Sequence, residues 1–120
     1  MILYIVIFGF LYSSYGDKVD DYINLIEIEI KQKNYLVAKD IFNNGLDKGF
    51  VNANFYFNGS NIFLKIDDLD NSNKYIIKAI ELKPTDDNYR KFQENLLELR
   101  NQLSRTNRIL EKGDYQEAIE

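Results

Sequence analysis

The chain has 120 residues, about one domain's worth, and its 45% hydrophobic and 28% charged residues are typical of a folded protein rather than a disordered one. Its net charge of −4 and lack of histidine argue against a nucleic-acid-binding surface, which needs many phosphate contacts. The absence of cysteine excludes disulfides, thiol nucleophiles, thiolate metal sites and a lipoprotein anchor.

An uninterrupted apolar run, ILYIVIFGFLY, occupies residues 2–12. It has the length of a secretory signal core, and Ser14 and Gly16 place small residues at the two positions that a signal peptidase reads. At about 1.5 Å per residue the run is too short for a hydrocarbon core of about 30 Å. We therefore interpret residues 1–16 as a signal peptide of an exported protein, periplasmic or secreted. Because no Lys or Arg precedes the run, two alternatives stay open. One is an uncleaved membrane anchor, and the other is a wrongly assigned start or an ordinary buried helix.

The next stretch predicts a helical hairpin over about 19–49. Asp17 can cap its first helix, and the turn falls at about 31–34. Tyr35 to Lys48 forms the return helix, which Gly49 ends. The residues expected to face inward from that helix are Leu36, Ala38, Ile41, Phe42 and Leu46.

A second hairpin is predicted at about 53–83, and Asn52 opens it. It matches the first hairpin at a period of about 34 residues, here called the repeat interval. The matching pairs include Tyr22 with Tyr56, Asn24 with Asn58, Ala38 with Ser72, Phe42 with Ile76, and Gly45 with Ala79. A fixed period of this length indicates stacked hairpins, because one hairpin cannot bury its own apolar face. The acidic turn from Asp67 to Asn71 lacks the glycine and the closing glutamate of a calcium loop, so we expect helix capping by Asp70 or Asn71 and no metal.

A long helix is predicted at about 87–112, because no Gly or Pro occurs from Asn88 to Lys112. Residues 84–87 are expected to end the preceding helix and to cap this one. The alternative to one continuous helix is a break between Ser104 and Asn107. A seven-residue apolar pattern runs along it, formed by Tyr89, Phe92, Leu96, Leu99, Leu103 and Leu110. Since the sequence stops at Glu120, part-way into the next expected helix, we expect the front piece of a longer array or a truncated product. Such a chain would self-associate through the long helix, around Leu96, Leu99 and Leu103.

These features resemble the tetratricopeptide repeat. They are the opening aromatics Tyr22 and Tyr56, small residues where helices touch (Ala38, Ser72, Gly45, Ala79), apolar plugs (Phe42, Ile76), Pro84, and a third turn from Gly113 to Ile119. Gly59 and Phe50 depart from the family's leucine and proline. The resemblance implies an all-α fold over residues 17–120, an α-solenoid of helical hairpins in a right-handed superhelix. Its repeats would span 19–52 and 53–86, with a partial, irregular repeat at 87–120.

The sequence offers no catalytic constellation. Histidine and cysteine are absent, and the six glycines are scattered rather than gathered in a phosphate loop. The carboxylate pairs Glu27/Glu29 and Asp67/Asp70 are expected on repeat surfaces without a shared cleft. We therefore expect neither enzymatic activity nor a cofactor.

The resemblance implies that the first helix of each hairpin lines a concave face that binds a partner. The repeat register assigns to this groove Asp20, Ile23, Asn24, Glu27, Ile30 and Lys31, then Asn54, Phe57, Asn58, Asn61, Leu64 and Lys65. Ile23 and Glu27 replace the lysine–asparagine pair with which some relatives grip a terminal carboxylate, whereas Asn58 matches their second asparagine. Asparagine amides can bond to an extended peptide backbone, and Phe57 with Asn58 would form a small hot spot. The alternative is that the asparagines only reflect an asparagine-rich composition.

Two functions follow. The first is a non-catalytic, exported interaction scaffold that binds a partner peptide or helix on its concave face. The alternative is a structural subunit that an uncleaved leader tethers to a membrane through residues 2–12 and that docks through the long helix.

Overall fold

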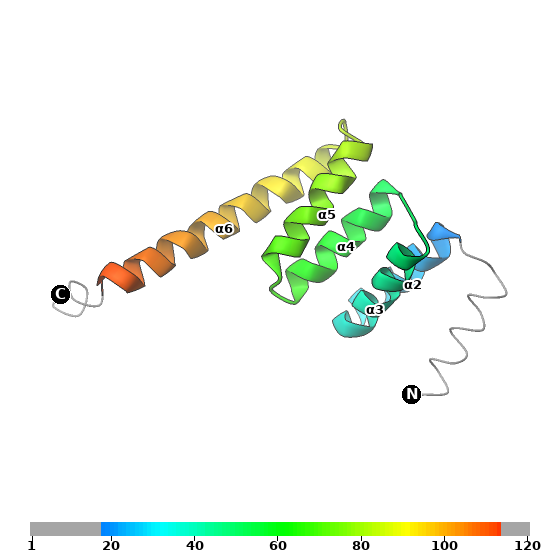
Figure 1. The fold of residues 1–120 in the computed structure, drawn as a ribbon, viewed down its shortest axis with the longest axis horizontal. Helices are drawn as coiled ribbons and strands as arrows, with labels where there is room; N and C mark the ends of the chain where they lie inside the picture. The colour runs from blue at the N-terminus through cyan, green and yellow to red at the C-terminus, as the bar shows by residue number, and fades with distance from the viewer. Residues whose placement is uncertain (1–17, 114–120) are drawn as a thin grey trace.

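The computed structural model describes residues 18–113, with side chains up to Leu110. This part of the chain is all-helical and has no strand, which confirms the predicted all-α class (Figure 1). The helices are α2 (Val19–Lys31), α3 (Tyr35–Asp47), α4 (Ala53–Lys65), α5 (Leu69–Leu82) and α6 (Asp87–Gly113). The predicted leader at 1–16, the Asp17 cap and the turn residues from Asp114 onward lie outside the described residues.

The helix positions repeat with the spacing expected from the sequence. Helices α2, α4 and α6 begin at Val19, Ala53 and Asp87, so each starts one repeat interval after the one before it. The turns inside the two hairpins repeat at the same interval, because Lys33 and Asp67 both adopt the left-handed backbone conformation, with φ of 62° and 63°.

The hydrogen bonds of these two turns also correspond. The amide of Asn34 donates to the Glu29 carbonyl, and the amide of Asp68 donates to the Phe63 carbonyl, each at 2.8 Å. This six-residue closure ends both first helices in the same way and holds a non-glycine residue in a conformation that costs energy. The two return helices therefore start in equivalent orientations.

Three helix ends lie at residues that the sequence predicted to end or start a helix. Gly49, with φ of 84°, ends α3. The Asn52 side chain accepts a hydrogen bond from the Phe55 amide at 3.0 Å and starts α4. Oδ1 of Asp86 accepts from the amides of Asn88 and Tyr89, at 2.9 and 3.2 Å, and starts α6.

The expected cap of α5 is wrong. Asp68, rather than Asp70 or Asn71, precedes the helix, and its side chain accepts from the Asn71 amide at 3.2 Å and from Asn71 Nδ2 at 2.7 Å. Asp70 lies inside the first turn, where its carboxylate pairs with Arg100 of α6 at 3.1 Å. The helix starts earlier than expected because the left-handed residue is Asp67, and a cap directly follows it.

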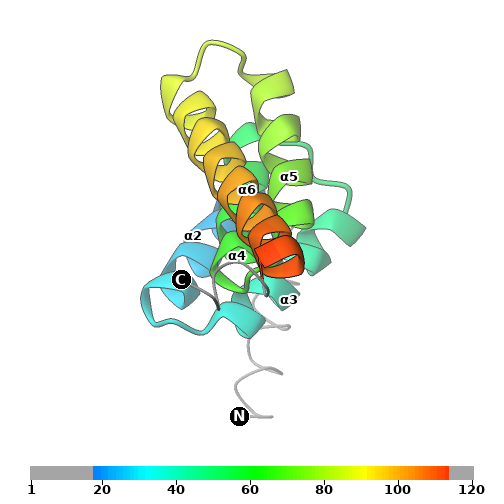
Figure 2. The same cartoon turned by 90° about the vertical axis from the view of Figure 1, so that its left-hand side faces the viewer.

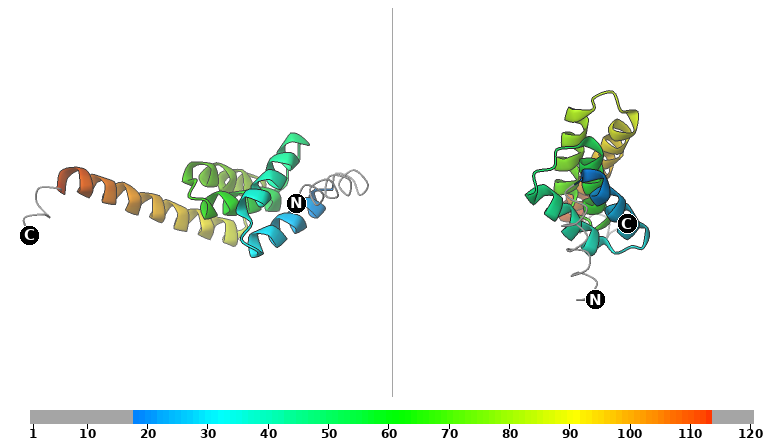
Figure 3. Two further views of the ribbon diagram at one scale, coloured as in Figure 1. Left: turned by 90° about the horizontal axis from the view of Figure 1, so that it is seen from below. Right: turned by 90° about the vertical axis from the view of Figure 1, so that its right-hand side faces the viewer.

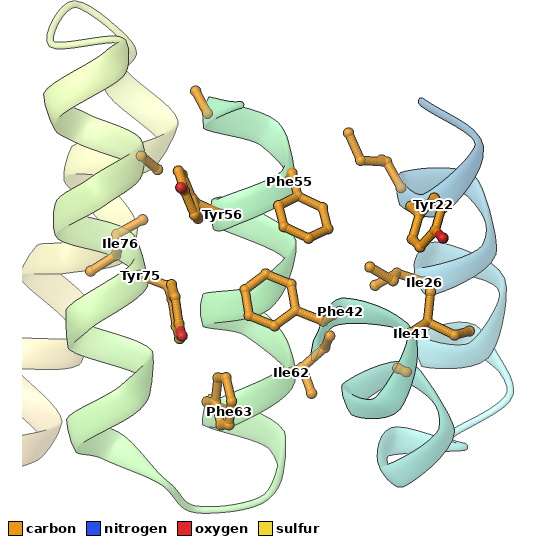
Figure 4. Packing of buried hydrophobic residues seen from close by; sticks show 14 of the residues in the cluster. Tyr22, Ile26, Ile41, Phe42, Phe55, Tyr56, Ile62, Phe63, Tyr75 and Ile76 are labelled. Atoms are coloured by element: carbon orange, nitrogen blue, oxygen red, sulfur yellow. The ribbon is translucent and has the colours of Figure 1, made fainter. Parts of the chain in front are cut away.

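The core draws residues from α2, α3, α4, α5 and α6, and α4 contributes more of them than any other helix (Figure 4). The Phe42 ring stacks on Phe55 with centroids 4.7 Å apart and meets the edge of Tyr75 at 4.9 Å. The α4 sequence is rich in aromatic residues and weak in intrinsic helix propensity. Packing on α2, α3 and α5 stabilises it instead.

Small residues let the helices of each hairpin approach closely. Ala38 in the first hairpin and Ser72 in the second are fully buried. The Ser72 hydroxyl donates to the Ser60 carbonyl at 2.8 Å, and the Ser60 hydroxyl donates to the Ser72 carbonyl at 2.6 Å. Each buried hydroxyl is therefore satisfied across the α4–α5 contact.

The predicted long helix is one continuous element, α6, without a break at 104–107. Its first half lies beside α5, as Figures 1 and 2 show, and its second half projects beyond the other helices (Figure 3). Every side chain from Asn101 to Leu110 is exposed. Among the described residues, no helix combines the length and apolar character needed to cross a membrane.

Two leucine side chains, those of Leu36 and Leu96, do not lie as the sequence predicted. Leu36 is 68% exposed, because it lies two residues, about 200° of helical rotation, from the inward-facing Ala38. Leu96 is only 2% exposed and belongs to the core, so it cannot contribute to a self-association surface; Leu99 and Leu103 are exposed.

Candidate partner-binding face

The predicted groove residues lie on the first helices of the two hairpins. Ile23, Asn24, Glu27 and Lys31 lie on α2, and Asn54, Phe57, Asn58, Asn61 and Lys65 lie on α4. Of these nine, the exposed residues are Asn24, Glu27, Lys31, Asn54 and Lys65; Phe57 and Asn61 are half-buried; Ile23 and Asn58 are buried. The three other residues of the register, Asp20, Ile30 and Leu64, are exposed, half-buried and half-buried.

The two buried members contribute to the fold. Ile23 packs in the hydrophobic core. Nδ2 of Asn58 donates to the Asn54 carbonyl at 2.9 Å and approaches Asn54 Oδ1 at 3.3 Å, so these donors are used inside α4. The polar surface is therefore supplied by their neighbours, above all the exposed Asn24 and Asn54 and the half-buried Asn61.

Phe57 joins α4 to α6. Its ring stacks on Tyr89 with centroids 5.0 Å apart and meets Phe92 edge-on at 5.3 Å. Burial raises the pKa of the Tyr89 hydroxyl above its usual 10.0, and the nearby Asp86 carboxylate raises it further. Phe57 thus presents only part of its ring to solvent and contributes to packing between first helices.

The same spacing adds two residues that the sequence argument missed. Asn88 and Asn95 on α6 lie one repeat interval after Asn54 and Asn61, and both are exposed. Extending the register by one more interval would have identified them. The three first helices together carry a series of asparagines whose amides can donate and accept hydrogen bonds.

The charged residues of this face, Glu27, Lys31 and Lys65, are of both signs. The described residues contain no group of three or more His, Cys, Asp or Glu side chains placed to hold a metal ion.

Glu27 and Glu29 were both expected on the surface, and this expectation is wrong for Glu29. Glu29 is only 2% exposed, and its carboxylate accepts a hydrogen bond from Asn34 Nδ2 at 2.9 Å. It lies in the last turn of α2, where the Asn34 side chain reaches back to it. Glu29 therefore helps to fix the hairpin turn rather than face solvent.

No protein-family model matches the chain, and no curated protein matches it in sequence.

Proposed function

We propose that this protein is a non-catalytic interaction scaffold of tetratricopeptide-like hairpins, which binds an extended peptide or a helix of a partner protein. The observation that carries the proposal is the constant repeat interval between α2, α4 and α6, together with the equivalent turns at Lys33 and Asp67. Stacked repeats require first helices and turns that recur at a fixed interval along the sequence, as they do in the two hairpins. In such a stack, a right-handed solenoid, the first helices share the concave face.

The exposed side chains of this face suit peptide recognition. The exposed Asn24, Asn54, Asn88 and Asn95, with the half-buried Asn61, can bond to the donors and acceptors of a peptide backbone without demanding a particular charge. Glu27, Lys31 and Lys65 at the helix ends would add charge selectivity. We propose export as the context of this activity, with residues 1–16 acting as the leader.

The proposal is tested by affinity capture from the native host with matched asparagine variants. The groove variant is Asn24→Ala with Asn61→Ala, and the control variant is Asn43→Ala with Asn44→Ala, whose two side chains are exposed on α3. Alanine favours the helix at all four positions, so neither pair should lower helicity. A partner retained by wild type and by the control but lost from the groove variant supports the concave face; equal retention by both contradicts it.

A second candidate function is a structural subunit that the leader tethers to a membrane and that docks through α6. The observation that favours it is the projecting half of α6, where Leu103, Ile109 and Leu110 are 46%, 49% and 57% exposed. In the same capture experiment, Leu99→Asp with Leu103→Asp distinguishes the two functions. Loss of the partner from this variant alone favours the structural subunit.

A further inference from the structure

Helix α4 has one accessible side, and α2 and α6 flank it. Most of its side chains are buried, and those that reach solvent are Asn54, Phe57, Asn61, Leu64 and Lys65. Their spacing of three and four residues aligns them along one side of the helix. Helix α2 packs on α4, and α6 reaches α4 through the rings that contact Phe57. The concave face is therefore a surface of three neighbouring first helices, with this side of α4 in its middle.

Two rows of polar side chains cross this face at the repeat interval. The first row is Asp20, Asn54 and Asn88, and the second row is Glu27, Asn61 and Asn95. Asn61 is half-buried, and the other five side chains are exposed. On each helix the rows are separated by two helical turns, about 10.5 Å. Each row therefore begins with a carboxylate on α2 and continues with amides on α4 and α6.

The two carboxylates on α2 are available to a ligand. Neither Asp20 nor Glu27 forms a hydrogen bond or an ion pair with another described residue. Lys31 follows Glu27 by one turn, but its equivalent Lys65 occupies the same place on α4, so this lysine does not distinguish the two helices. On α6 the Glu98 carboxylate pairs with Arg105 at 3.7 Å. The rows thus make the face more negative over α2 than over α4 and α6.

We infer that the bound partner segment carries a Lys or Arg over α2 and is uncharged over α4 and α6, and that Asp20 and Glu27 set this polarity. The inference rests on the concave-face binding proposed above and adds the charge of the partner. Lys and Arg side chains are donors only, and their hydrogen bonds to carboxylates are stronger than those to neutral amides. An acidic segment over α2 would instead meet two like charges. The carboxylates therefore fix which end of the partner segment lies over α2.

Variants that exchange carboxylates for amides test this polarity. The face variant combines Asp20→Asn with Glu27→Asn, which gives α2 the residue that α4 and α6 carry in both rows. The control variant combines Asp40→Asn with Asp47→Asn, which removes two exposed carboxylates from α3 instead. The two variants have the same net charge, and both should keep the helical circular dichroism of the wild type.

The probe is a phage library of short random peptides between constant flanking residues, selected in parallel on the three full-length proteins. Peptides enriched by the wild type and the control should hold Lys and Arg at one end, at least about three-fold more often than peptides enriched by the face variant. In the most enriched peptide, replacing these residues by Gln should weaken binding to the wild type at least about three-fold and leave binding to the face variant unchanged. The wild-type comparison does not depend on the folding of either variant.

The outcomes separate this inference from the proposed function. Equal Lys and Arg content in the peptides from the wild type and the face variant would overturn the inference and leave concave-face binding in place. So would peptides in which Asp and Glu predominate. A wild type that enriches no peptide above an empty surface would overturn the proposed function, and the inference with it.

Discussion

The ring of Phe42, on α3, lies directly over Gly59 of α4, in the space that a β-carbon at residue 59 would need. The relationship is reciprocal, because the Phe55 ring of α4 lies over Gly45 of α3, where an added β-carbon would stand 2.5 Å from Cζ of Phe55. Each helix thus has a glycine over which an aromatic ring of the other helix packs. This pair of contacts fixes how the second hairpin packs on the first.

Gly59→Ala is expected to destabilise the protein by about 1–3 kcal/mol, because the methyl group overlaps the fully buried Phe42 ring. In a helix without this contact the same change would stabilise by roughly 0.5–1 kcal/mol, so the sign alone is informative. Chemical denaturation measures the difference. The double variant Phe42→Leu with Gly59→Ala should lose less stability than the sum of the two single changes; strict additivity would show that the two positions do not touch.

Phe57→Ala is expected to cost on the order of 2 kcal/mol, less than a fully buried phenylalanine, because it removes the stacking on Tyr89 and the contact with Phe92. Hydrogen exchange should speed up in the first turns of α6. Lys65→Ala, an exposed change on the same helix, serves as the control. If Phe57→Ala and Lys65→Ala are equally stable, then Phe57 is not part of the packing and is available to a partner.

Asp68→Ala is expected to destabilise by about 1 kcal/mol at neutral pH, because it removes the cap of α5. Hydrogen bonds from the Asn71 side chain and amide hold the pKa of Asp68 below 3.8. Because the pKa of Asp68 is lower in the folded state than in the unfolded state, its carboxylate stabilises the fold at pH values above the unfolded-state pKa. This stabilisation is lost as the pH falls through the folded-state pKa. The stability difference between wild type and variant should therefore persist above pH 3.8 and shrink below it. A difference that does not change with pH would contradict the cap.

The proposed leader makes a prediction about the mature protein. If residues 1–16 are removed on export, then mass spectrometry of protein purified from its native host should give Asp17 as the first residue. Met1 retained in the membrane fraction would instead support the tethered structural subunit.

The sequence was sufficient to predict the helices and their spacing, because helical periodicity, Gly49, Asn52 and Asp86 are local signals. It did not predict the burial of Glu29, since a carboxylate is normally exposed and its Asn34 partner becomes close only once the turn has formed. Asp68 was missed as a cap because the acidic run offers several candidates, and only the left-handed conformation of Asp67 decides between them.

The candidate site was predicted less well than the helices. The repeat register placed the groove residues on the first helices, but register alone does not report how much of a side chain a neighbour covers. Phe57 is covered by α6 because Tyr89 and Phe92 are aromatic, which depends on a helix one repeat interval further along the chain. Asn58 is buried, and its amide bonds within its own helix, which the register does not report either.

The central claim is that the face shared by α2, α4 and α6 binds the partner, and site-specific photo-crosslinking in the native host tests it most directly. A photoreactive residue is introduced singly at Asn24 or Asn61 on this face, and at Asn44 on α3 or Leu103 on the projecting part of α6 as comparisons. The account predicts the same protein adduct from Asn24 and Asn61 and little or none from Asn44 and Leu103. An adduct from Leu103 or Asn44 without one from Asn24 or Asn61 would contradict it.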